Sequence, residues 1–183
     1  MTPSPGTNAL LVIDIQQNLV DPSSRLHIDT TNIELFFKNV NHTIRQFETA
    51  GQPIFYITNE WSNPLLNWIT GNVCKKGGKG VGPDSRLSLV NDKLYRKSLN
   101  NALSNRELVR DLQEKQVSGI YLLGLFAEHC VKATLTSALK KNFKVTVIID
   151  ALGAKNDKNL RKSLQFYRYK GAALVSASHP GDI

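Results

Sequence analysis

Short apolar runs, most of them rich in branched residues, recur along the chain, and most are separated by segments with helical spacing. Runs of this kind are typical of strands buried on both faces of a parallel sheet. Strands are therefore predicted over residues 8–14, 53–58, 92–96, 119–124, 144–150 and 172–177.

Apolar residues at helical spacing predict helices between these strands. The expected helices cover residues 33–47, 104–115, 130–141 and 160–171. Thr31 with Glu34, and Ser104 with Glu107, fit capping boxes at the start of the first two helices. Strands that alternate with helices predict an α/β fold with a mostly parallel, doubly wound sheet covered by helices on both faces, which makes three layers.

Length and cysteine content limit the class of protein. The 183 residues fit one domain over 1–183, and no apolar run is long enough to span a membrane. The first eight residues, MTPSPGTN, lack the pattern of a signal peptide. Two cysteines are too few for a disulfide framework, so a reducing, cytoplasmic location is expected.

The net charge of +8 permits binding to nucleic acid. The basic residues are dispersed, however, and only Lys75, Lys76 and Lys79 form a cluster. No nucleic-acid motif surrounds them, so we expect a basic solvated surface and neither nucleic acid nor membrane as a partner. Attraction of an anionic substrate stays open as an alternative.

Three reactive residues lie where predicted strands end, and ligands bind at the carboxyl ends of strands in open parallel sheets. Asp14 ends the first strand, Lys97 follows the third, and Cys130 lies beyond the fourth at the start of a helix. A helix N-terminus and a nearby lysine both favour a thiolate. Asp14 would take the thiol proton and return it to the leaving group. Taken singly, the residues also fit a core thiol, a turn cap and a surface lysine.

Three segments strengthen the catalytic interpretation. ALLVIDIQQNLV (9–20), YRKSLNNAL (95–103) and the stretch 122–151 with its Cys-Val pair resemble, in this order, segments of the isochorismatase-like cysteine hydrolases. The resemblance covers nearly the whole chain. It implies a six-stranded, Rossmann-like sheet and homo-oligomers, usually dimers or tetramers.

The resemblance also implies roles for individual residues. The catalytic triad of the family corresponds to Cys130, Asp14 and Lys97. A non-proline cis peptide is implied between Leu125 and Phe126. Backbone N–H groups of Ala127 and Cys130 would bind the oxyanion.

The chain also departs from the family pattern. Ala127 and Leu103 stand where the family often has Thr and Phe, which leaves the detail of the pocket open. The nicotinamidase branch holds a metal with an Asp-x-His motif after the second strand, and the segment 57–68 here has no histidine. We therefore expect neither a metal nor another cofactor.

The function expected from these features is hydrolysis of a non-peptide C–N bond in a small amide or ureido compound, through a thioester on Cys130. The alternatives are an isochorismatase-type ether hydrolase and a non-catalytic scaffold of the same fold. Gln16, Trp61 and Phe126 are candidate pocket residues.

Overall fold

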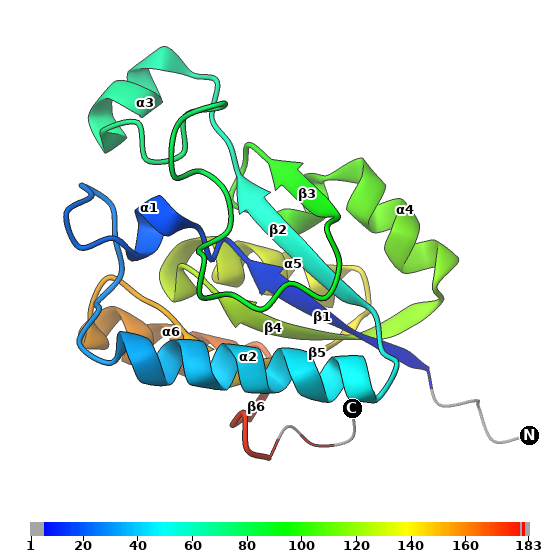
Figure 1. The fold of residues 1–183 in the computed structure, drawn as a ribbon. Helices are drawn as coiled ribbons and strands as arrows, with labels where there is room; N and C mark the ends of the chain where they lie inside the picture. The colour runs from blue at the N-terminus through cyan, green and yellow to red at the C-terminus, as the bar shows by residue number, and fades with distance from the viewer. Residues whose placement is uncertain (1–5, 180, 182–183) are drawn as a thin grey trace, which may run out of the picture.

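The computed structural model describes residues 6–179 and 181 and is built around one six-stranded sheet (Figure 1). Every pair of neighbouring strands is parallel, and the order across the sheet is β3-β2-β1-β4-β5-β6. The strands are β1 (Thr7–Ile13), β2 (Ile54–Asn59), β3 (Leu94–Lys97), β4 (Val117–Gly124), β5 (Lys144–Leu152) and β6 (Ala173–Val175). The predicted α/β class and the parallel sheet are confirmed.

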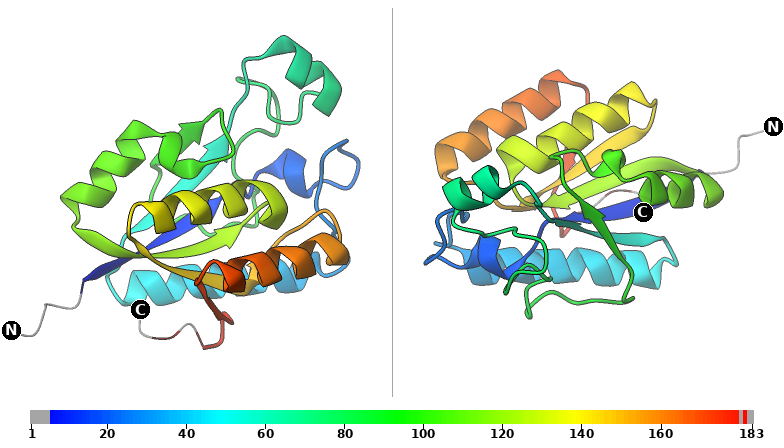
Figure 2. Two further views of the ribbon diagram at one scale, coloured as in Figure 1. Left: turned by 180° about the vertical axis from the view of Figure 1, so that it is seen from behind. Right: turned by 90° about the horizontal axis from the view of Figure 1, so that it is seen from above.

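Helices cover both faces of this sheet (Figure 2). Helix α2 (Ile33–Thr49) lies on one face, and α4 (Arg106–Glu114), α5 (Lys132–Lys140) and α6 (Asp157–Tyr169) lie on the other. Successive side chains of β1 point to opposite faces, so Leu10 and Val12 pack with the α2 layer while Leu11 and Ile13 pack with the other three helices. The fold is thus the predicted three-layer sandwich.

Shorter helical segments lie in the connections. They are α1 (Gln17–Val20), α3 (Pro64–Thr70), the 3-10 turn η1 (Ala102–Ser104) and the π-helical turn η2 (Ala127–Val131). Helix α3 stands away from the sheet (Figure 1) and exposes Leu65, Trp68 and Ile69. Within the described residues, every helix is too short or too polar to cross a membrane.

Neither predicted capping box forms. Thr31 donates its hydroxyl to the carboxylate of Asp29, a stronger acceptor two residues away, and α2 begins after Asn32 without a side-chain cap. Ser104 belongs to η1, where its hydroxyl bonds the carbonyl of Asn101. The cap of α4 is instead Asn105, whose Oδ1 accepts the N–H of Leu108.

Candidate active site

Four neighbouring strands deliver polar side chains to one edge of the sheet. Lys97 is the last residue of β3, Asn59 is the last of β2, Asp14 follows β1, and Cys130 lies in η2 after β4. The strand order changes direction around β1, with β2 on one side and β4 on the other. Such a switch point is where open α/β sheets bind ligands.

Asp14 leaves the sheet through a left-handed turn. Its φ is 53°, a conformation that Asp tolerates better than most non-glycine residues. The backbone N–H of Asp14 donates to Ile57, and its carbonyl accepts from Gln16. The carboxyl is thereby fixed beyond the end of β1.

Gly124 brings the Cys130 turn close to β1. Its φ of 116° is a glycine conformation, and a Cβ placed there would lie 2.1 Å from the carbonyl oxygen of Ile13. The next residue, Leu125, donates its N–H to that same carbonyl. Tyr167 then donates its hydroxyl to the carbonyl of Ala127 and holds the turn from the α6 side.

The three predicted catalytic side chains meet in this buried space. Lys97 Nζ lies 2.7 Å from Asp14 Oδ2 and 3.4 Å from Cys130 Sγ. Two asparagines flank the sulfur, with Asn59 Nδ2 at 3.9 Å and Asn100 Oδ1 at 3.8 Å. The second carboxyl oxygen, Asp14 Oδ1, has no hydrogen-bond partner within residues 6–179 and 181. It is therefore free to accept a proton.

Burial dominates the electrostatics of the cluster. It raises the pKa of Asp14, and the charge of Lys97 opposes that rise only in part. Burial pulls the pKa of Lys97 downward, but the Asp14 charge and the sulfur outweigh it, so the pKa is raised and the ammonium is kept.

The expected stabilisation of a thiolate by Lys97 is opposed by two effects. Burial, followed by the negative charge of Asp14, raises the pKa of Cys130 despite Lys97. Cys130 lies in the π-helical turn η2, which continues without a break into α5, so it stands in the first turn of this helix, as predicted. The raised pKa favours the thiol form, from which a nucleophile has to lose its proton as it reacts.

Two expectations about the turn before Cys130 are corrected. The Leu125–Phe126 peptide bond is trans, the form that a non-proline bond strongly favours. Ala127 is not a free oxyanion donor, since its N–H already donates to the carbonyl of Gly153 at 2.8 Å. Phe126 N–H, by contrast, makes no hydrogen bond to any residue that the structure describes.

The cluster opens into a cavity of about 420 Å³, within the range of small-molecule sites. The predicted pocket residues Trp61 and Phe126 lie in its wall, and Gln16 does not. The amide of Gln16 is fully buried and engaged with the backbone of Asn59 and Val81, which leaves it nothing to offer a ligand. The wall consists of Asp14, Leu19, Leu26, Asn59, Trp61, Leu66, Cys74, Ser98, Leu99, Asn100, Phe126, His129 and Cys130.

Several of these residues were missed in the sequence. Asn59 is the last residue of β2, so the strand-end rule that selected Asp14 also applies to it. Cys74 directly precedes the predicted solvated cluster of Lys75, Lys76 and Lys79, yet it is fully buried in the cavity wall. Burial raises its pKa to about 12. The lysines themselves are exposed.

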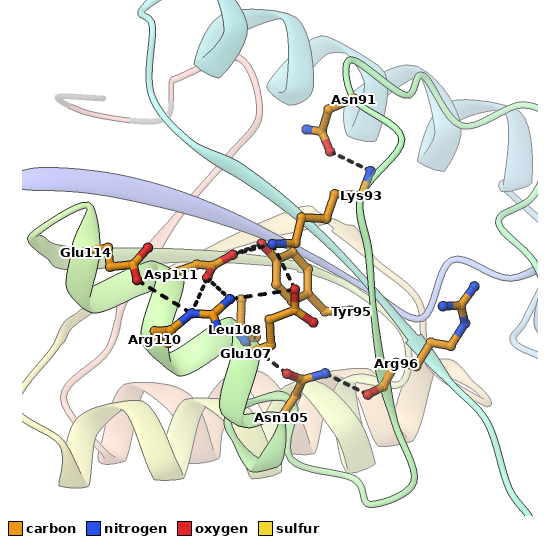
Figure 3. Close-up of polar contacts among 10 residues, drawn as sticks. All are labelled: Asn91, Lys93, Tyr95, Arg96, Asn105, Glu107, Leu108, Arg110, Asp111 and Glu114. Atoms are coloured by element: carbon orange, nitrogen blue, oxygen red, sulfur yellow. Dashed lines mark hydrogen bonds and ion pairs between the residues drawn. The ribbon is translucent and has the colours of Figure 1, made fainter.

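Hydrogen bonds and ion pairs to α4 and to its cap Asn105 hold the strand that carries Lys97 (Figure 3). Asp111 of α4 accepts hydrogen bonds from Lys93 and from the Tyr95 hydroxyl, both at 2.6 Å. Asn105 donates to the carbonyl of Arg96, next to Lys97. Downstream, Thr134 of α5 accepts the N–H of Ala102 and ties the following segment to the Cys130 helix.

A metal site does not emerge from the described side chains. No three His, Cys, Asp or Glu residues among them are grouped closely enough to hold an ion. The second strand is followed by Glu60 and Trp61, and Glu60 pairs with Arg96 at 2.9 Å. A metal-free enzyme stays a prediction, which elemental analysis of the purified protein tests.

Together, the fold and the site define an α/β enzyme with a buried thiol, carboxyl and ammonium group at its switch point. Residues 8–179 match the isochorismatase domain model, so the chain belongs to the isochorismatase family of hydrolases.

Individual relatives agree with this assignment. The uncharacterized isochorismatase family protein YddQ of Bacillus subtilis is 27% identical over 146 residues, which cover 79% of this chain and 77% of that protein. An isochorismatase family protein from Desulfovibrio vulgaris has the same fold, with a TM-score of 0.85 at 18% identity over 94% of this chain and 95% of the other. So does N-carbamoylsarcosine amidase from Thermoplasma acidophilum, with a TM-score of 0.80 at 23% identity over 94% and 98%.

Proposed function

We propose that this hydrolase cleaves a non-peptide C–N bond in a small amide or ureido compound, with Cys130 as the nucleophile. The observation that carries the proposal is the contact of Cys130 Sγ with Lys97 Nζ at 3.4 Å, next to the Asp14 carboxyl and at the wall of a cavity of small-molecule size. The fold shared with N-carbamoylsarcosine amidase supports the choice of bond.

The proposed first half-reaction begins with the thiol proton. Asp14 Oδ1 accepts this proton while Cys130 Sγ attacks the substrate carbonyl carbon, and the carbonyl oxygen becomes an oxyanion. The C–N bond then breaks, the proton passes from Asp14 to the leaving nitrogen, and a thioester remains on Cys130. Lys97 holds Asp14 Oδ2 and adds positive charge beside the sulfur as it becomes anionic.

Water completes the reaction in the second half. Asp14 takes a proton from a water molecule while the oxygen of that water attacks the thioester carbon. The C–S bond then breaks, the acid leaves, and the proton returns to Cys130. The net change is amide plus water to acid plus amine or ammonia.

The oxyanion needs backbone donors that are not already engaged. Ala127 is excluded by its bond to Gly153, whereas Phe126 N–H has no partner within the described residues. We propose Phe126 N–H together with Cys130 N–H as the donors. Both residues lie in the cavity wall.

A screen of small amides, ureides and carbamoyl compounds tests the function. The native protein should release ammonia or amine from at least one compound, and Cys130→Ala should abolish this release. Thermal unfolding of Cys130→Ala separates loss of chemistry from loss of fold. Turnover that survives in Cys130→Ala would overturn the proposal.

Two alternatives are distinguished by the same proteins. A scaffold would hydrolyse nothing in the screen, and an ether hydrolase would act on a vinyl ether without needing the thiol. The homo-oligomeric state, the cytoplasmic location and the lack of nucleic-acid or membrane partners stay predictions.

A further inference from the structure

Two buried acceptor oxygens beside Cys130 lack partners among the described residues: Asp14 Oδ1 and Asn59 Oδ1. Both residues are almost completely buried, at 1% and 2% exposure, and both lie in the cavity wall. A buried acceptor without a donor is costly and is normally paired. The role of Asp14 Oδ1 as proton acceptor in the proposed reaction explains why it has no partner. The proposed reaction gives no such role to Asn59 Oδ1.

The side chain of Gln16 fixes the backbone of Asn59. Gln16 Oε1 accepts its N–H at 2.8 Å, and Gln16 Nε2 donates to its carbonyl at 3.1 Å and to Val81 at 2.6 Å. The backbone of Asn59 is thus clamped on both sides. Its side chain starts from this fixed point and reaches Cys130, with Nδ2 3.9 Å from the sulfur.

The rest of the cavity wall is mainly apolar, with Leu19, Leu26, Leu66 and Leu99 beside two aromatic side chains. Its other polar residues are Ser98, Asn100 and the exposed His129, and no lysine or arginine is among the described lining residues. Lys97 is not among the residues that line the cavity, because its side chain is fully buried in an ion pair with Asp14. A carboxylate or phosphate on the substrate would therefore lose water without gaining a matched cation.

We propose that Asn59 is a specificity-determining residue whose Oδ1 accepts an N–H of the substrate's unsubstituted amide nitrogen, while the apolar wall selects an uncharged acyl group. The proposal rests on the proposed function and narrows its substrate class. A –CO–NH₂ group has two N–H donors, which match Asp14 Oδ1 and Asn59 Oδ1. An ester or ether has no such donor and would leave Asn59 Oδ1 unpaired.

Three probes separate these requirements: benzamide, methyl benzoate and 4-carbamoylbenzoate. Native enzyme should hydrolyse benzamide with a kcat/KM at least about 10-fold above that for 4-carbamoylbenzoate, since only the latter carries a carboxylate. Asn59→Leu keeps a similar volume and removes the acceptor. It should lower kcat/KM for benzamide by about 10- to 100-fold and leave that for methyl benzoate within about 3-fold.

The pattern across the probes tells the possible failures apart. Equal losses on benzamide and methyl benzoate in Asn59→Leu would show that Asn59 only supports the nucleophile, and would overturn the inference. Preference of the native enzyme for 4-carbamoylbenzoate would overturn the uncharged pocket. Absence of any Cys130-dependent turnover of amides would overturn the proposed function itself. Thermal unfolding of Asn59→Leu is the control for an intact fold.

Discussion

Lys97 Nζ and Asp14 Oδ2 lie 2.7 Å apart, and the two side chains are 0% and 1% exposed. Charges buried to this degree are costly unless each has its partner. Because the pair joins the ends of β3 and β1 across the intervening β2, it connects the site to the sheet that supports it. Stability and catalysis should therefore both respond to the pair, in different ways.

Removal of one partner should destabilise the fold more than removal of both. Lys97→Met leaves the Asp14 carboxylate buried without its cation and should cost about 3–5 kcal/mol. The double variant Asp14→Asn/Lys97→Met removes both charges and should recover part of that loss. Urea unfolding of the native protein, both single variants and the double variant measures the coupling. Additive losses would contradict a buried, interacting pair.

Activity should rise with pH as Asp14 ionises. The active form of Asp14 is the carboxylate, and burial raises its pKa above 3.8, so the acid limb of kcat/KM should lie above the range of an ordinary aspartate. Asp14→Asn tolerates the left-handed backbone and should lose about 10²–10⁴-fold in rate together with this limb. The pH profile of kcat/KM is the measurement. An acid limb retained in Asp14→Asn would assign it to another group.

Alkylation should distinguish the two cysteines. Both have raised pKa values, so reaction with iodoacetamide at neutral pH should be slow and should accelerate about tenfold for each pH unit. Cys130, 5% exposed, should react before the fully buried Cys74. Lys97→Ala should slow the labelling of Cys130 because the opposing positive charge is lost.

Peptide mapping after timed exposure gives the two rates. An unchanged rate of Cys130 labelling in Lys97→Ala would show that the charge of Lys97 does not promote ionisation of the thiol. Faster labelling of Cys74 would show that the loop carrying it opens in solution.

Acid should weaken the anchor of β3. Hydrogen bonds from Lys93 and then Tyr95 lower the pKa of Asp111 to about 2. The stabilising effect of this carboxylate is therefore complete above the pKa of an unfolded aspartate, near 4, and is lost as the pH falls towards 2. Asp111→Asn should cost about 1.5–3 kcal/mol at pH 7 and less at pH 2.5. An equal cost at both values would contradict the assignment.

The strands and the three reactive residues followed from the sequence because they depend on local patterns. Apolar runs of strand length are visible in one chain, and the carboxyl ends of parallel strands must share an edge. Asp14, Lys97 and Cys130 could therefore be brought together without knowledge of the loops. The same rule covers Asn59, one residue past the predicted end of its strand.

Features that depend on distant contacts were not predictable in this way. Cys74 is buried because the loop folds back, with Asn18 donating to the carbonyls of Val73 and Lys79, and no periodicity in that loop indicates it. The N–H of Ala127 is engaged because Gly153 lies opposite it. Gln16 is a clamp for Asn59 because two segments remote in sequence meet around its amide.

The central claim is that Cys130 carries the acyl group during C–N hydrolysis. The most direct measurement is intact-protein mass spectrometry after rapid acid quenching of the enzyme with a turned-over amide, followed by peptide mapping. The account predicts an added mass equal to the acyl group on the peptide with Cys130, which appears before steady state and is absent in Cys130→Ala. Steady turnover with unmodified Cys130 under conditions that trap a thioester, or an acyl group located on Cys74, would contradict it.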